Sequence, residues 1–345
     1  MDRCIKLRLI SDQEHNSQIV TGFLMLADRY NLKIQNDIVT RGKRDWSVPH
    51  IVECEYAGLK IAYDTSDGYF EGIQSWVEKY DLYFKRSFSR EKNLYLLGES
   101  LSQRVYPLGF NYFVTCPGNP YGTAGRNWKT CVRGILGRKE KDYFTPERFR
   151  YKENEHLTGK VIFFTRLWKP ETYLSDEINA QRETINSMRI ELLRSLRKEL
   201  GDRFVGGLFE ADFEKQMAAA LVVPRSVTRR ENYLKLLHAS DIAIGSTGLH
   251  DSIGWKTGEY VAAGKSIVNE KFCYEVPGNF CEGENYLSFD CPDVCLNHVK
   301  YLVEHPDVVA EMQNNNRRYY DQYLVPDKMI ERTLAIAEGR EDFCD

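Results

Sequence analysis

The feature that most constrains the fold of this chain is an alternation of strand-like and helix-like segments that begins twice. The first series starts near the N-terminus with CIKLRLI, and the second restarts at residues 159–166 with the apolar run GKVIFFTR. Strands that alternate with helices predict doubly wound α/β sheets. A chain of 345 residues also exceeds the size at which one hydrophobic core usually stops growing. The sequence therefore predicts an α/β fold with two Rossmann-like domains facing across a cleft.

The first series predicts particular elements and a domain boundary. A helix is expected over 22–30, two strands joined tightly at Ala57-Gly58 within 50–64, a helix over 69–80 and a strand over 81–86. The first domain is expected to span 1–155, and it includes a linker rich in Gly, Pro and basic residues. Between 126 and 152 this linker has nine Lys or Arg against three acids. It is interpreted as a solvated connection or as a basic surface for a phosphate-bearing acceptor or an anionic membrane face.

The second series predicts a domain over 156–325 and a C-terminal helix and tail over 326–345 that crosses back to the first domain. A long helix is expected from an N-cap at Ser175 to a terminator at Gly201. Three terminal helices should each begin with Pro-Asp, because proline and an acidic residue are both favoured in the first turn. The remaining elements are strands at 203–209, 241–246 and 265–271 and helices at 229–240 and 256–263.

The composition limits the kinds of binding partner and the cellular compartment that we expect for this protein. A net charge of -3 gives no bulk attraction to nucleic acid. The nine cysteines are scattered and odd in number, and no zinc-site spacing accompanies them, so free thiols in a reducing cytosol are expected. No signal-peptide pattern and no apolar run of membrane-spanning length occurs. The expected location is therefore cytoplasmic, with peripheral contact at the inner face of a membrane as an addition.

The strongest candidate for a binding loop is GSTGLHDSIGW, residues 245–255, between a predicted strand and a predicted helix. In open α/β sheets, ligands bind outside the carboxyl ends of the strands. Gly245 and Gly248, beside Ser246, allow the backbone to approach a ligand closely. A helix that begins near Gly254 turns its free N–H groups toward the same place, which favours an anion.

Charged residues follow this loop and the strand before it. Lys256 adds a cation at the helix start, and Asp251 and Glu259 could accept from sugar or ribose hydroxyls. The simpler interpretation of the two acids is a helix cap and a solvated side chain. Arg166 and Lys169 follow the strand at 159–166, and such a pair matches a diphosphate; a surface ion pair is the alternative. A further set of aromatic candidates for stacking on a base or sugar consists of Trp168 and Trp255.

These residues resemble a family. Asp251-x7-Glu259, followed by YVAAGKSIV, is similar to the E-x7-E signature of glycosyltransferases with the GT-B fold. The segments GWKTGEYVAAGKSIVNEK and GENYLSF resemble those of group 1-like transferases of bacterial polysaccharide gene clusters. The resemblance covers most of 160–325. Two departures are that Asp251 replaces the first Glu and that Arg166 and Lys169 are separated by three positions where the family usually has five.

The resemblance implies a transfer of a sugar from a nucleotide-sugar donor, held by the C-terminal domain, to a glycan or lipid-linked saccharide acceptor, held by the N-terminal domain. It implies that Glu259 accepts from the ribose, that Asp251 lies near the donor sugar, and that Arg166 and Lys169 neutralise the leaving diphosphate. This assistance replaces a metal ion, so neither a metal nor a separate cofactor is expected.

The first domain offers candidates for a general base near the acceptor. His15 follows the first strand, with Asp12 and Glu14. A histidine has a suitable pKa for such work, and an inert exposed loop residue is the alternative. Asp64 and Asp67 follow a strand in YDTSDGYF; turn and cap chemistry is the alternative. Lys85 and Arg86 could contact an acceptor phosphate.

Other enzyme classes are disfavoured. The sequence has no GxGxxG after a first strand, no GxxxxGK[ST], no HExxH and no GxSxG. Two alternatives to the transferase stay open. One is a nucleotide-sugar epimerase or a phosphorylase of the same fold, and the other is a non-catalytic protein that binds a nucleotide or a glycan.

Overall fold

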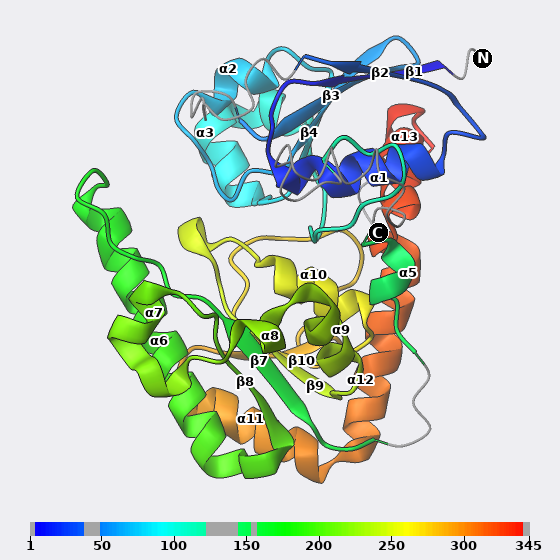
Figure 1. Cartoon of the computed structure of the whole chain (residues 1–345). Coiled ribbons are helices and arrows are strands. Elements are labelled where there is room, and N and C mark those ends of the chain that lie inside the picture. The colour runs from blue at the N-terminus through cyan, green and yellow to red at the C-terminus, as the bar shows by residue number, and fades with distance from the viewer. Residues whose placement is uncertain (1–3, 38–48, 122–143, 153–156, 341–345) are drawn as a thin grey trace, which may run out of the picture. The chain divides into compact units, whose positions relative to one another are not determined.

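The structure is a computed structural model, and it describes residues 4–37, 49–121, 144–152 and 157–340 (Figure 1). The chain divides into two compact units. The first contains 1–149, 275–278 and 321–345, and the second contains 150–274 and 279–320. Each unit is built on one sheet with helices on both faces. The predicted α/β class with two Rossmann-like units is confirmed.

The sheet of the first unit has the strand order β2-β1-β3-β4-β5-β6. Only β3 runs antiparallel to its neighbours, and it forms a hairpin with β4 through Ala57 and Gly58, whose φ angles are 52° and 82°. This is the tight connection that the sequence predicts. The strands are β1 (Cys4–Leu9), β2 (Asn31–Asn36), β3 (Ile51–Tyr56), β4 (Leu59–Asp64), β5 (Leu82–Lys85) and β6 (Val105–Pro107).

Helices cover the two faces of this sheet. On one face α2 (Ile73–Val77) and α3 (Arg90–Ser102) pack on an apolar cluster that includes Tyr83 and Val105. On the other, α1 (Ser17–Met25) packs against the C-terminal helix α13 (Pro326–Ala337). The two helices approach closely at Gly22, where a Cβ would lie 2.3 Å from the Pro326 carbonyl oxygen. A short helix, α5 (Pro146–Phe149), also belongs to this unit.

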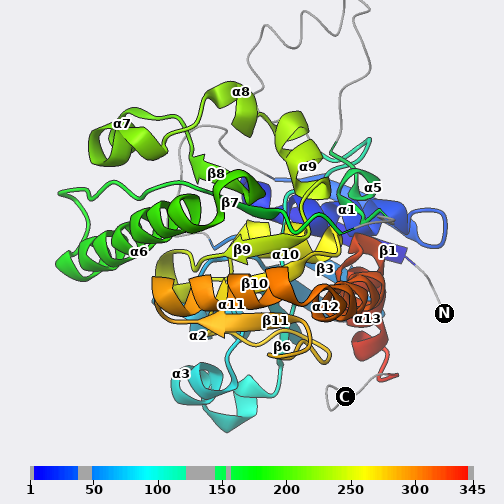
Figure 2. The same cartoon turned by 90° about the horizontal axis from the view of Figure 1, so that it is seen from below.

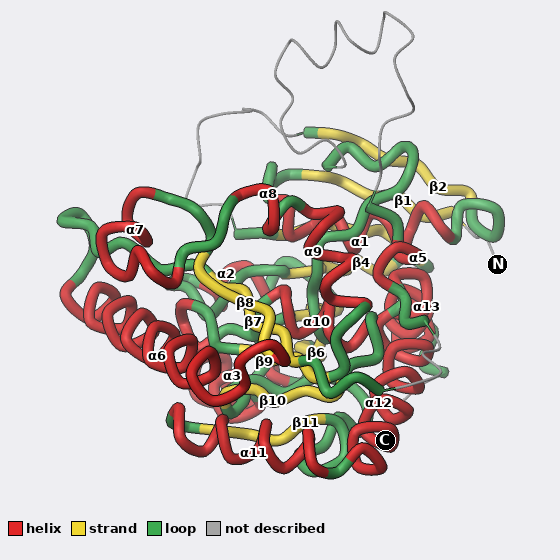
Figure 3. Tube along the Cα trace, turned by 60° about the horizontal axis from the view of Figure 1, so that its bottom comes forward, coloured by secondary structure: helices red, strands yellow, loops and turns green. Residues whose placement is uncertain are grey.

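The sheet of the second unit is entirely parallel, with the order β11-β10-β9-β7-β8. Numbered from its own first strand, this is the 2-1-3-4-5 order of doubly wound folds. Figure 3 shows the long helix α6 running beside β7 and β8. The strands are β7 (Val161–Thr165), β8 (Phe204–Leu208), β9 (Ile242–Gly245), β10 (Ser266–Glu270) and β11 (Tyr286–Phe289).

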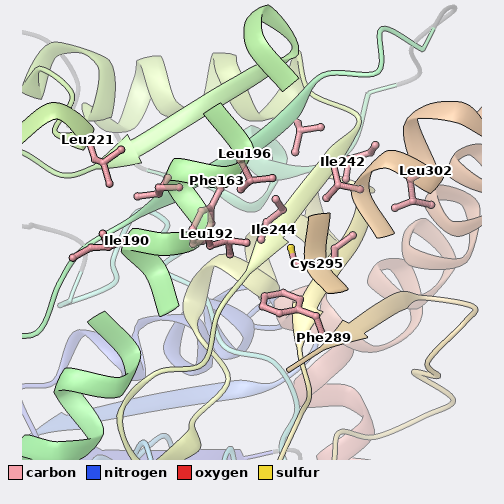
Figure 4. Packing of buried hydrophobic residues seen from close by; sticks show 14 of the residues in the cluster. Phe163, Ile190, Leu192, Leu196, Leu221, Ile242, Ile244, Phe289, Cys295 and Leu302 are labelled. Atoms are coloured by element: carbon pink, nitrogen blue, oxygen red, sulfur yellow. The ribbon is translucent and has the colours of Figure 1, made fainter. Parts of the chain in front are cut away.

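The main core of the second unit lies on one face of this sheet. Side chains of β7 and β9 meet those of α6 (Asp176–Leu200) and α11 (Pro292–Glu304) in one apolar cluster (Figure 4). Figure 2 shows α11 and α12 (Pro306–Tyr319) beside β10. The opposite face carries α9 (Arg230–His238) and α10 (Trp255–Ala262), and Tyr233 packs edge-on to Phe164. The short helices α7 (Asp212–Ala218) and α8 (Arg225–Thr228) complete the unit.

Local sequence signals place several helix ends correctly. The Ser175 side chain accepts a hydrogen bond from the Ile178 N–H at 3.3 Å, and α6 ends at Gly201, whose φ is 51°. The three Pro-Asp helices also form as predicted. Two boundaries differ from the prediction: α1 begins at Ser17 and ends at Met25, and α2 is only five residues long. Gly72 precedes α2 with a φ of 77°, which prevents the helix from starting earlier.

Two predictions about membranes have different outcomes. Within the described ranges, no helix is long and apolar enough to cross a bilayer. Most of the basic segment predicted as a membrane or acceptor surface falls on residues 122–143, which lie outside the described residues.

Candidate functional site

The candidate site lies at the carboxyl edge of the parallel sheet in the second unit. Because parallel strands end at the same edge, the residues that follow β7, β8 and β9 gather there. Arg166 follows β7, Phe209 follows β8, and Gly245 closes β9. The guanidinium of Arg166 lies 5.9 Å from the centre of the Phe209 ring. The sheet order therefore brings together residues that are far apart in the sequence.

The loop after β9 is shaped by close backbone approach. A Cβ at Gly245 would lie 1.8 Å from Asn269 Oδ1, which itself accepts a hydrogen bond from the Thr257 hydroxyl at 3.1 Å. Glycine is therefore needed where β9 passes β10. The Gly248 N–H donates to the Ser252 carbonyl oxygen at 2.8 Å and closes a tight loop. These bonds set the position at which α10 begins.

The helix α10 begins after Gly254, as predicted, and places Lys256 in its first turn. The ammonium of Lys256 lies 3.9 Å from the centre of the Tyr233 ring and 5.3 Å from that of Phe209. Burial lowers the pKa of Lys256 to about 8. The Glu259 carboxylate acts to raise this pKa, and the cations Arg230 and Arg166 act to lower it. Cation–π contacts hold the ammonium without neutralising its charge.

Glu259 lies one turn further along α10 and is 1% exposed. Its Oε1 forms an ion pair with Arg230 Nη1 at 2.7 Å. Its Oε2 is buried and has no hydrogen bond within 3.5 Å in the described chain. The Tyr233 hydroxyl faces the carboxylate as a longer-range hydrogen-bond donor, which also lowers the pKa of Glu259. Burial acts to raise the pKa of Glu259, but the charges of Arg230 and Lys256 outweigh it and hold the pKa below its usual value. The residue is therefore an anion with one unused acceptor oxygen.

A buried arginine joins the two loops of this edge. Arg189, on α6, donates to the Arg166 carbonyl oxygen at 2.7 Å and to the Thr247 carbonyl oxygen at 2.8 Å. Its Nε donates to the Ser246 hydroxyl at 3.0 Å. Glu270 closes the network, because its Oε2 accepts from the Thr247 N–H at 2.6 Å. The buried Arg189 thus orients the loop residue Ser246, which was predicted to bind the donor.

The structure brings some of the predicted residues together and leaves others apart. Arg166, Lys256 and Glu259 form one charged group with Arg230. Asp251 is exposed, with a φ of 58°, and its Oδ1 accepts from Gln181 at 3.1 Å.

Two other predicted residues stand at the borders of this charged group. The Lys169 side chain is exposed, and the Lys169 carbonyl oxygen accepts a hydrogen bond from Arg182. Trp255 is the first residue of α10 and is half-buried.

In the first unit, Asp64 lies in the core. It is fully buried, and Oδ2 accepts from Lys85 Nζ at 2.9 Å and from the Tyr83 hydroxyl at 2.8 Å. Oδ1 accepts from the Ser66 N–H at 2.8 Å. Burial acts to raise the pKa of Asp64, but Lys85 outweighs it and the pKa is lowered. Both oxygens are occupied and shielded from solvent, so the geometry favours a structural role for Asp64 and Lys85 over contact with an acceptor.

Asp67 and His15 lie together at the same end of β4. Asp67 Oδ1 accepts from Arg86 Nη1 at 2.6 Å and lies 3.9 Å from His15 Nε2. The His15 ring stacks on His50, with centroids 5.3 Å apart. Burial acts to raise the pKa of Asp67, but Arg86, His15 and His50 together hold it lower than usual. The Asp67 side chain is 39% exposed, so this carboxylate, unlike Asp64, is reachable from solvent.

Several residues of the site were not predicted from the sequence. Arg189 occupies the buried face of α6, between Ile185 and Leu193, and a charge on an apolar stripe is a signal that could have revealed it. Arg230 and Phe209 carry no such local signal, because their positions depend on how α9 and β8 pack. Among the described residues, no group of three His, Cys, Asp or Glu side chains could hold a metal ion.

Comparison with known proteins gives matches among solved structures only. No family model matches the chain, and no curated protein matches it. A glycosyltransferase from Rickettsia africae is 11% identical, with 94% of this chain and 81% of that chain covered and a TM-score of 0.48. The Anabaena protein HepE, in complex with UDP and glucose, is 13% identical, with coverages of 76% and 65% and a TM-score of 0.40.

A third match is shorter. The C-terminal domain of a group 1 family glycosyl transferase from Francisella tularensis is 12% identical, and 52% of this chain and 96% of that chain are covered, with a TM-score of 0.35. All three TM-scores lie below 0.5.

Proposed function

We propose that this protein is a glycosyltransferase that moves a sugar from a nucleotide-sugar donor to a glycan or lipid-linked saccharide acceptor without a metal ion. In this proposal the second unit binds the donor and the first binds the acceptor, as in the GT-B arrangement that the sequence resembles. A cytoplasmic location, peripheral at the inner face of a membrane, belongs to the same proposal.

The observation that carries the proposal is the pair of cations, Arg166 and Lys256, at the carboxyl edge of the parallel sheet. In the described chain neither side chain donates a hydrogen bond to a carboxylate, and both lie against the Phe209 ring. Lys256 shares the single carboxylate of Glu259 with Arg230, so the group keeps a net positive charge. Such a charge suits a diphosphate, and the start of α10 adds its N–H groups. Fixed positive charge at this position would stabilise the diphosphate as it leaves the sugar.

The unused oxygen of Glu259 supports the sugar-nucleotide part of the proposal. A buried carboxylate oxygen without a hydrogen bond is costly, and a ribose hydroxyl would satisfy it. Asp251 is proposed to lie beside the donor sugar, and Gly245, Ser246 and Gly248 to leave room for the diphosphate.

On the acceptor side, we assign the general base to the pair of His15 and Asp67. Asp67 lies 3.9 Å from His15 Nε2, close enough to stabilise the imidazolium that forms when the histidine takes a proton. Asp64, with no accessible oxygen, is left out of this role.

The first experiment is a thermal-shift screen of the full chain against UDP, GDP, CMP and dTDP, each with Mg²⁺ or with EDTA. A ligand that binds the native state raises the melting temperature by mass action. We expect one nucleotide to stabilise the protein equally in Mg²⁺ and EDTA, and Glu259→Ala to abolish the shift. No shift at millimolar concentrations would contradict the proposal.

The matching nucleotide sugar then distinguishes the enzyme classes. A transferase releases the nucleoside diphosphate only as fast as the sugar is transferred to an acceptor, or to water in place of the acceptor. An epimerase would instead convert the donor sugar with no release, and a binding protein would leave the donor intact with every acceptor tested.

A further inference from the structure

Arg189 is unusual because its charge is buried among neutral partners. The residue is 5% exposed. Its three hydrogen bonds go to two backbone carbonyl oxygens and one hydroxyl, those of Arg166, Thr247 and Ser246. Glu270 acts on it electrostatically without a direct hydrogen bond. A buried charge that lacks a hydrogen-bonded counter-ion costs folding free energy, so stability alone gives little reason for it.

The partners of Arg189 belong to the two loops that border the charged group. One bond fixes the backbone of Arg166 after β7, and the other two fix Ser246 and Thr247 after β9. The Arg166 charge is also close enough to lower the pKa of Arg189, which burial, the larger cause, brings to about 10. Arg189 therefore stays protonated at neutral pH beneath the other cations.

We infer that Arg189 is a positioning residue for the diphosphate of the donor, an inference that rests on the proposed function of this edge. It couples the loop after β7 to the loop after β9, so that the Arg166 guanidinium and the Ser246 hydroxyl are held together before the ligand arrives. Its buried charge adds to the positive potential at the same place. Preorganised donors of this kind need no rearrangement when the ligand binds.

The same helix supplies a matched control. Arg197 lies two turns further along α6 and also donates to backbone carbonyl oxygens, those of Gly206, Ala220 and Leu221, at 3.2, 2.5 and 3.2 Å. None of these belongs to the loops after β7 and β9. Substitution of either arginine by methionine removes a charge and its hydrogen bonds but keeps an apolar chain on α6, and only Arg189 touches the proposed site.

The test uses inorganic pyrophosphate as the probe, in EDTA, with the full chain and isothermal titration calorimetry well below the melting temperature. We expect Arg189→Met to weaken pyrophosphate binding at least tenfold, Arg189→Lys to restore part of the loss, and Arg197→Met to change affinity less than twofold. Hydrogen exchange provides a readout without ligand. Arg189→Met should speed exchange in the loops at 166–170 and 246–254, and Arg197→Met only around 206–221.

The outcomes separate this inference from the proposed function. If wild type binds pyrophosphate and Arg189→Met binds it as tightly, with unchanged exchange in both loops, the positioning role is overturned while the donor site stands. Equal losses in Arg189→Met and Arg197→Met would also overturn it, because they would indicate a general effect on folding. If wild type itself does not bind pyrophosphate, the proposed donor site fails, and this inference fails with it.

Discussion

The Glu259 carboxylate is paired with Arg230 on one oxygen, 2.7 Å from Nη1, and has no hydrogen bond in the described chain on the other. The pair joins α10 to α9. Lys256, three positions before Glu259, lies against Tyr233, which is three positions after Arg230. Two cations therefore surround one buried anion, and the group as a whole is positive. This imbalance is what a bound diphosphate would correct.

Glu259→Ala should destabilise the protein strongly, because it leaves Arg230 and Lys256 without their counter-charge in a largely buried setting. Breaking a buried ion pair by removing one partner costs about 3 kcal/mol or more. Urea unfolding at pH 7 measures this loss. The control is Glu199→Ala, which removes an exposed pair with Lys300 at 2.8 Å and should cost much less, because solvent screens exposed ion pairs. Similar losses in the two variants would contradict a buried role for Glu259.

Nucleotide affinity should fall as the pH rises above about 8. The pKa of Lys256 is lowered to about 8 by burial, so the ammonium loses its proton through this range and its attraction to a diphosphate disappears. A bound diphosphate favours the protonated form, so binding takes up a proton at high pH, and affinity decreases by up to about tenfold per pH unit. Calorimetry between pH 7 and 9.5 measures the slope.

The variant Lys256→Met isolates this effect. It should bind more weakly at pH 7 and show a nearly flat profile, because the titrating group is gone. Lys265, whose pKa burial also lowers to about 8, donates to the carbonyl oxygens of His238 and Ser240. A slope that persists in Lys256→Met would assign the titration to another group.

Asp64→Asn should mainly lower the stability of the protein, whereas Asp67→Asn should mainly lower its activity. Asp64→Asn breaks the buried pair with Lys85 and should cost about 3 kcal/mol at pH 7. Because the folded-state pKa of Asp64 is lowered, its contribution is present above the unfolded value of about 3.9 and is lost as the pH falls through the folded value. The stabilities of wild type and variant should therefore converge in strong acid.

Asp67→Asn should cost less stability, since its side chain is 39% exposed. It should leave nucleotide binding unchanged and lower the rate of sugar transfer. Chemical unfolding and a transfer assay together test the pair. A fully active Asp67→Asn enzyme would remove Asp67 from the acceptor site.

The sequence predicts the parts of the fold that depend on local chemistry. Ser175, Gly201 and the Pro-Asp dipeptides mark helix ends because caps and φ preferences act within a few residues. The strand β2 was not predicted, because it is an edge strand with mostly polar, exposed residues and lacks an apolar signal.

The candidate site was predictable only in part. Arg166 follows a strand, Lys256 lies in the first turn of a helix and Glu259 lies one turn further along it, and the sequence shows these positions. Arg230 reaches Glu259 across 29 positions, and Arg189 reaches Thr247 across 58, so both contacts depend on tertiary packing. The buried setting of Asp64 likewise depends on β5, which supplies Lys85 and Tyr83.

The most direct test of the central claim is calorimetric titration of the stabilising nucleoside diphosphate, in EDTA, into wild type, Lys256→Met and Lys169→Met. A hydrogen bond to a charged group contributes about 1.5–3 kcal/mol. We expect at least tenfold weaker binding for Lys256→Met and a smaller loss for Lys169→Met, whose side chain is exposed. Unchanged affinity in Lys256→Met, or no binding by wild type, would contradict a diphosphate site at this edge of the sheet.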